Sequence, residues 1–209
     1  NTKDFADVLA YARKKGILEI TSLTHGQLID EKLAEKIVMA EPSWISFSID
    51  GLEPTYNKIR TPPNKVNDKS YNAFEKVSNA IKLLDKFKKK YSKSRPSIRT
   101  NSIFPAMQRD PESYRNYMES IGVDFVTVNE IKDYRFHDLP DDRIQDEWAC
   151  QYPFQRLTVS ANGIILPCAG AYNEEEGLVI GKYQNSKDKV IRDYKGNVVK
   201  TNLDDLSLE

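Results

Sequence analysis

The chain has 209 residues, of which 39% are hydrophobic, and it carries 31 Lys and Arg residues against 31 Asp and Glu residues. This balanced charge gives no bulk attraction to nucleic acid or to an anionic membrane. No apolar run reaches the roughly 20 residues of a membrane span, and no signal-peptide pattern opens the chain. Two cysteines are too few for a secreted disulfide scaffold. We therefore expect a reduced, cytoplasmic protein that begins inside a longer chain, because Asn1 is not an initiator Met.

Helical periodicity and strand-like runs alternate through the first 129 residues. Helices are expected at Asp4–Lys15, from an Asp30 cap to Pro42, at Glu53–Arg60, from a Ser70 cap through Phe87, and from an Asp110 cap to Gly122. Strands are expected at residues 17–23, 44–51, 98–104 and 123–129. This order predicts an α/β fold with parallel strands and right-handed crossovers, either a (βα) barrel or a doubly wound sheet.

The strand at residues 44–51 departs from the usual pattern of a helix-covered parallel strand, which is apolar on both faces. Its apolar residues are Ile45, Phe47 and Ile49, and its polar residues are Ser46, Ser48 and Asp50. A polar row on the inner face of such a sheet indicates a lumen that holds a ligand, with Asp50 at the carboxyl end where α/β sites lie. The alternative is an antiparallel strand with one solvated face and an Asp-Gly turn.

The last third of the chain has a different pattern. Residues 132–149 read as a linker, and residues 156–160 and 164–167 flank Asn162-Gly163, a strong signal for a hairpin with a two-residue turn. That turn would place Ala161 opposite Ile164. Cys150 and Cys168 flank the hairpin, and taken alone such cysteines are more often buried small residues than metal ligands.

Several motifs, in order, resemble radical S-adenosyl-L-methionine (SAM) enzymes with a SPASM-type auxiliary iron–sulfur domain. They are Thr24-His25-Gly26, Ser48-Ile49-Asp50-Gly51 with Tyr56 and Arg60, Arg99–Ile103, Cys150 with Gly163-x4-Cys168, and Leu203–Glu209. The resemblance implies a partial TIM-like (βα) barrel over residues 1–131, a linker over 132–149, and a truncated SPASM-like module over 150–209.

By this resemblance, the longer protein would be an oxidoreductase or maturase that reduces SAM at a [4Fe–4S] cluster. The resulting 5′-deoxyadenosyl radical would abstract hydrogen from a peptide, a protein or a sugar-type small molecule. The resemblance assigns cofactor binding to Ser48, Asp50 and Arg60, with Thr24 and Asn101 as weaker candidates. It assigns an auxiliary cluster to the thiolates of Cys150 and Cys168.

The family's Cys-x3-Cys-x2-Cys and Gly-Gly-Glu-Pro segments are absent from this sequence, so we expect the segment alone to be inactive. Each candidate also has a simpler interpretation: Ser48 as a small filler, Asp50 as the first residue of a turn, and Arg60 as a surface residue ending a helix. His25 is a further candidate for a side chain near the substrate.

Two other functions stay open from the sequence. One is a cluster-free module that binds a peptide or protein partner on a degenerate barrel. The other is an unrelated α/β enzyme that binds a nucleotide, although no Gly-rich phosphate loop supports it. If the barrel is open, the strand at residues 17–23 exposes an edge through which the chain can dimerise.

Overall fold

The computed structural model describes residues 4–103, 110–129, 152–160, 163–167 and 179–182. The chain divides into two compact units, residues 1–135 and residues 136–209. Among the described residues, none of the helices combines the length and the apolar character needed to cross a membrane.

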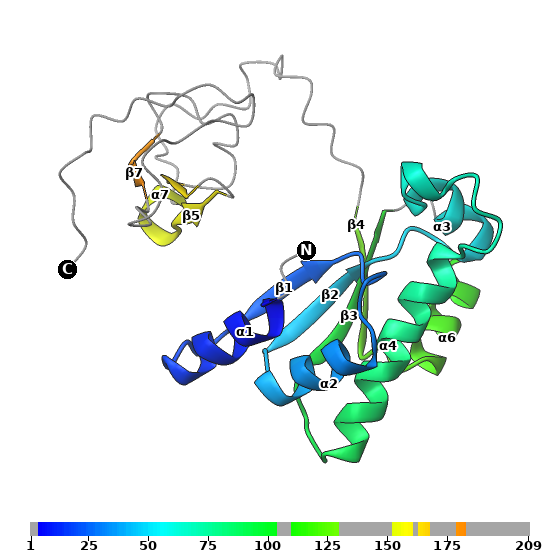
Figure 1. The fold of residues 1–209 in the computed structure, drawn as a ribbon, viewed down its shortest axis with the longest axis horizontal. Helices are drawn as coiled ribbons and strands as arrows, with labels where there is room; N and C mark the ends of the chain where they lie inside the picture. Colours follow the sequence, from blue (N-terminus) through cyan, green and yellow to red (C-terminus); the bar gives the residue numbers. More distant parts are fainter. Residues whose placement is uncertain (1–3, 104–109, 130–151, 161–162, 168–178, 183–209) are drawn as a thin grey trace. The chain divides into compact units, whose positions relative to one another are not determined.

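The first unit is built on a four-stranded parallel sheet (Figure 1). Its strands are β1 (Thr21–Thr24), β2 (Trp44–Ser48), β3 (Ser97–Ile103) and β4 (Phe125–Asn129). They lie side by side in the order β1-β2-β3-β4, and every pair is parallel. The predicted α/β class and the parallel setting of residues 44–51 are therefore confirmed, and the antiparallel alternative is wrong.

The described residues of this unit also form five α-helices and one short 3-10 helix, of which the first precedes β1 and the others connect the strands. They are α1 (Phe5–Lys14), α2 (Glu31–Ala40), α3 (Glu53–Arg60), η1 (Pro63–Lys65), α4 (Ala73–Lys90) and α6 (Pro111–Ser120). Because the strand order never reverses, right-handed crossovers put the connecting helices on one face of the sheet. None of the described helices of this unit lies on the other face, and we call it the open face. The described residues form an open sheet and not a closed barrel.

The hydrophobic core lies between the sheet and its helices. Ile45, Phe47 and Ile49 from the β2 segment are fully buried, as the alternation of the sequence predicts. They pack in a single cluster with the apolar stripe of α4 and with residues of α1, α2 and α6. The alternate residues of the same strands therefore face the open side, which fixes the face on which each candidate of β2 and β3 lies.

Two predicted boundaries were wrong for local reasons. The long helix α4 is capped by Asn72, whose side-chain oxygen accepts from the Glu75 N–H at 3.0 Å. Ser70 instead donates its hydroxyl to Asp68 at 2.6 Å and lies in the preceding turn. The first strand begins at Thr21 and not at residue 17, because the Arg13 guanidinium binds the carbonyls of residues 17 and 18, each at 3.0 Å.

The second unit contains a short antiparallel sheet. Its described elements are α7 (Tyr152–Gln155), β5 (Thr158–Val159), β6 (Ile164–Leu166) and β7 (Gly181–Lys182), with strand order β5-β6-β7. The predicted hairpin is confirmed, but its predicted register is wrong. Val159 pairs with Ile165, and the Ser160 N–H donates to the Ile164 carbonyl at 2.8 Å. Ser160 thus pairs with Ile164, where a two-residue turn would have paired Ala161, and Gly163, just before β6, has φ of 78°.

Candidate functional site

The carboxyl ends of β2 and β3 bring two of the predicted residues together on the open face. Ser48 of β2 lies opposite Asn101 of β3 in the parallel register. Asn101 in turn accepts a hydrogen bond at 2.6 Å from the side-chain amide of Asn129, at the end of β4. The Ser48 and Asn101 side chains are both half-buried, so this row presents a hydroxyl and amide groups at the edge where parallel sheets bind ligands.

Asp50 and Arg60 form an ion pair at the same end of the sheet. Asp50 follows β2, and Arg60 is the last residue of α3, the helix that comes next in the chain. The Arg60 Nε donates to Asp50 Oδ2 at 2.7 Å, and Nη2 contacts the same oxygen. The carboxylate side chain is only 3% exposed, whereas the guanidinium side chain is 38% exposed. Of the two groups, Arg60 is therefore the one that a ligand can reach.

A buried amide fixes the end of α3 and hence the position of Arg60. The Gln27 side chain, in the loop after β1, donates from Nε2 to the Arg60 carbonyl at 3.0 Å. Its Oε1 accepts from the Tyr71 hydroxyl at 2.7 Å. Nearby, Tyr56 is fully buried on α3, and this burial raises the pKa of its phenol. The loop after β1 and the carboxyl end of α3 are thus held together.

The backbone before Asp50 is held from the helix-covered side. Tyr114 of α6 donates its hydroxyl to the Ile49 carbonyl at 2.9 Å. Burial raises the pKa of the Tyr114 phenol to about 12, although the hydroxyls of Thr100 and Ser102 act in the opposite direction. The phenol therefore keeps its proton at neutral pH and fixes the peptide that carries Asp50.

Thr24 and His25 do not join the group at the ends of β2 and β3. Thr24 pairs in register with Phe47, which puts it on the helix-covered face. Its hydroxyl accepts from the Gly26 N–H at 3.0 Å, and the His25 Nδ1 accepts from the Gln27 N–H at 3.2 Å. Both side chains therefore stabilise the turn after β1, in which Gly26 has φ of 74°.

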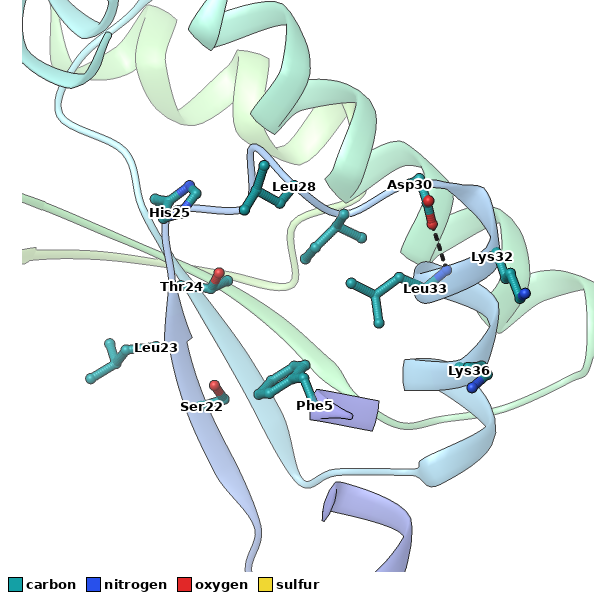
Figure 2. Close-up of a pocket in the computed structure, with 11 residues that line it drawn as sticks. Phe5, Ser22, Leu23, Thr24, His25, Leu28, Asp30, Lys32, Leu33 and Lys36 are labelled. Atoms are coloured by element: carbon teal, nitrogen blue, oxygen red, sulfur yellow. Dashed lines mark hydrogen bonds between the residues drawn. The ribbon is translucent and has the colours of Figure 1, made fainter. Parts of the chain in front are cut away.

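A pocket of about 520 Å³ lies beside this turn, along β1 (Figure 2). Phe5 of α1 and Leu33 of α2 line it, and Leu23 lies on the opposite side of β1 from Phe5. Strand β1 is at the edge of the sheet. Leu23 and Leu28 are 66% and 60% exposed, respectively. Leu23 is the register partner of Ser46 and therefore lies on the open face, whereas Ser22 and Thr24 of the pocket lie on the helix-covered face.

The predicted metal ligands Cys150 and Cys168 lie outside the described residues. Among the residues that the structure does describe, no group of three His, Cys, Asp or Glu side chains is arranged to hold a metal ion.

Reasoning from the sequence missed two features of the open face. Asn129 ends its strand at the same edge as Asn101, and the rule that sites lie at carboxyl ends was sufficient to find it. Arg99 lies between the aromatic rings of Trp44 and Phe125. No sequence signal identified that cluster, because its members are distant in sequence and meet only through strand register.

Comparison with known proteins gives one informative similarity. A segment of 58 residues is 40% identical to Fe-coproporphyrin III synthase of Methanosarcina barkeri (strain Fusaro / DSM 804). The match covers 28% of this chain and 14% of the relative. That relative is a radical SAM enzyme, so the match supports a relationship with the radical SAM superfamily. No protein family model matches the chain.

Proposed function

We propose that this chain is the part of a radical SAM enzyme that binds SAM and substrate on the inner face of a partial TIM-like (βα) barrel. One observation carries the proposal. Four parallel strands follow one another without reversal, and the face opposite the helices ends in a polar row that contains Ser48 and Asn101. A sheet of this kind curls toward its open face when it forms a barrel, and ligands bind at the carboxyl ends of its strands. The similarity to a radical SAM enzyme agrees with this proposal.

The side chains present suit the polar groups of SAM. The exposed guanidinium of Arg60 can bind the methionyl carboxylate, because its planar fork matches carboxylate geometry. Asp50, which is almost fully buried, orients that guanidinium and does not meet the ligand itself. Ser48 and Asn101 offer a hydroxyl and an amide for the ribose hydroxyls. When bound and reduced, SAM supplies a 5′-deoxyadenosyl radical for hydrogen abstraction, and the protein orients substrate and excludes water.

The residues of this chain do not suit the catalytic [4Fe–4S] cluster. Such a cluster in this family takes three thiolates from Cys-x3-Cys-x2-Cys, whereas the chain has two cysteines, 18 positions apart in the sequence. We propose instead that Cys150 and Cys168 contribute to an auxiliary cluster of a SPASM-like module over residues 150–209. Anaerobic reconstitution with iron and sulfide tests this assignment, because Cys→Ala at either position is expected to lower absorbance near 400 nm. If both variants keep the iron–sulfur content of the wild type, the two cysteines are not cluster ligands and serve only in packing.

Binding of SAM tests the main proposal. Isothermal titration of the 209-residue chain is expected to detect SAM, and Arg60→Gln is expected to weaken binding by about tenfold, the value of one charge-assisted hydrogen bond. Lys58→Gln, on the exposed side of the same helix, is the matched control and should leave affinity unchanged.

A second ligand distinguishes loss of the contact between Arg60 and the methionyl carboxylate of SAM from a general loss of structure. 5′-Methylthioadenosine keeps the nucleoside but lacks the amino acid, so the wild-type chain and Arg60→Gln should bind it equally. If Arg60→Gln weakens the binding of both ligands equally, Arg60 acts in folding and not in recognition of the carboxylate. If the wild-type chain does not bind SAM, the proposal is wrong.

The second candidate function is a module that binds an extended peptide at the edge of the sheet. The pocket beside β1 and the exposed Leu23 and Leu28 favour it, because an unpaired edge strand can accept a further strand. A synthetic peptide of residues 17–26 serves as the probe. This function predicts that the peptide binds and slows hydrogen exchange at the amides of β1, and it fails if exchange there is unaffected.

A further inference from the structure

A cation lies between two aromatic rings on the open face. Arg99 of β3 has Ser46 and Phe125 as its register partners on β2 and β4, so it shares a face with Ser48 and Asn101. Its guanidinium carbon is 5.0 Å from the centre of the Trp44 ring and 5.3 Å from the centre of the Phe125 ring. Three adjacent strands thus each contribute one member, and we call this group the Arg99 cluster.

Within the described part of the chain, the guanidinium of the Arg99 cluster has no carboxylate partner in an ion pair. The Arg99 Nε only reaches the Ser97 hydroxyl at 3.5 Å. The nearby Trp44 donates its indole N–H to Glu19 at 3.2 Å. Arg60, by contrast, is paired with Asp50.

The surroundings of Arg99 favour binding of an anion. The Arg99 side chain is half-buried, so it is partly accessible, and the two rings beside it exclude part of its water. Attraction between opposite charges is stronger in such a partly dry setting than in bulk water.

The accessible surface of the cluster also indicates what accompanies the anion. Phe125 is 59% exposed, which is a large apolar area beside a charged group. A ligand that places an apolar or aromatic group against Phe125 and an anionic group on Arg99 matches both features.

We infer that the Arg99 cluster binds a carboxylate-bearing substrate whose apolar part lies against Trp44 and Phe125. A carboxylate matches a single cation, whereas a phosphate of higher charge would need further cationic donors. The neighbouring strand residues Ser46, Ser48 and Asn101 are neutral, and the carboxylate of Glu19 already accepts the Trp44 indole N–H. Trp44 and Phe125 begin β2 and β4, so the cluster lies nearer the amino ends of the strands than the Ser48 and Asn101 row does. This inference rests on the proposed function only in taking the open face as the ligand-binding face. It adds a substrate class, which the SAM contacts do not define.

Matched aromatic probes test the inference. 2-Naphthoate carries the carboxylate, 2-naphthamide is its neutral counterpart, and 2-naphthyl phosphate carries the alternative anion. In isothermal titrations of the 209-residue chain, naphthoate should bind about tenfold more tightly than naphthamide, and also more tightly than the phosphate. Arg99→Gln should abolish the preference for the carboxylate, whereas Arg99→Lys should retain part of it.

Controls keep the outcome interpretable. Lys82→Gln removes one positive charge from an exposed position of α4, on the helix side, and should leave the preference intact. Equal binding of naphthoate and naphthamide by the wild-type chain overturns the inference without any variant, and tighter binding of the phosphate overturns the assignment to a carboxylate. Arg60→Gln distinguishes the two proposals. It should weaken SAM binding and leave the naphthoate preference intact. If the wild-type chain fails to bind SAM while it keeps the naphthoate preference, the cofactor assignment fails and the Arg99 site stands.

Discussion

Replacing Gly26 with Ala should destabilise the first unit far more than the same change at Gly16. Both glycines have positive φ, 74° and 83°, so each alanine carries a backbone cost of about 1 kcal/mol. A Cβ at Gly16 meets no atom within 4 Å, whereas at Gly26 it would lie 2.6 Å from two carbons of the Phe47 ring and 3.0 Å from Val77. Phe47 and Val77 are fully buried, and overpacking of this kind adds about 1–3 kcal/mol.

Urea denaturation followed by circular dichroism measures the difference. We expect Gly26→Ala to lower the free energy of unfolding by about 2–4 kcal/mol and Gly16→Ala by about 1 kcal/mol. Equal losses in the two variants would refute the reasoning, because only the contact with Phe47 distinguishes them. The result also explains the glycine of the Thr-His-Gly motif as a packing requirement where the loop crosses the core.

Three further outcomes follow from contacts described above. Tyr114 has a pKa near 12 in the folded chain against 10.0 for a free phenol, so the unfolded state loses this proton first as pH rises. Stability should therefore fall by about 2 kcal/mol more in the wild type than in Tyr114→Phe between pH 10 and 12, as measured by urea denaturation. Asp50→Asn should lower the free energy of unfolding by about 1–2 kcal/mol, because the carboxylate is buried and Arg60 is only partly exposed. Lys86→Gln removes an ion pair that is exposed on both sides and should lower it by less than about 0.5 kcal/mol. Equal losses in the two variants would contradict the role assigned to burial. A dimer formed through β1 should show a molar mass in light scattering that rises with concentration, and Leu23→Lys should keep the chain monomeric. A wild-type monomer at all concentrations would exclude that dimer.

The order of helices and parallel strands was predictable because both periodicities are strong in the first 129 residues. Alternation alone placed Ile45 and Phe47 in the core and Ser48 on the opposite face. The start of β1 was not predictable, because residues 17 and 18 have strand propensity but their carbonyls are bound by Arg13. Local side-chain competition of this kind leaves no trace in hydrophobic periodicity.

The candidate site was only partly predictable. Asp50 and Arg60 were each identified, but as two separate ligand contacts, whereas the turn of α3 makes them partners. Thr24 belongs to the opposite face from Ser48, and only the register with Phe47 reveals this. The Arg99 cluster likewise needs three strands in register, information that no local pattern contains.

The hydrogen bonds of Gln27 have a mechanical consequence. One side-chain amide ties the turn that borders the β1 pocket to the last carbonyl of α3, from which Arg60 projects. Outward movement of the Arg60 backbone breaks this hydrogen bond unless the turn follows, and a buried amide left without its partner costs about 1–3 kcal/mol. The rim of the pocket and the end of α3 are therefore mechanically coupled. A molecule bound in the pocket would change the position of Arg60, and a molecule bound at Arg60 would change the position of the turn.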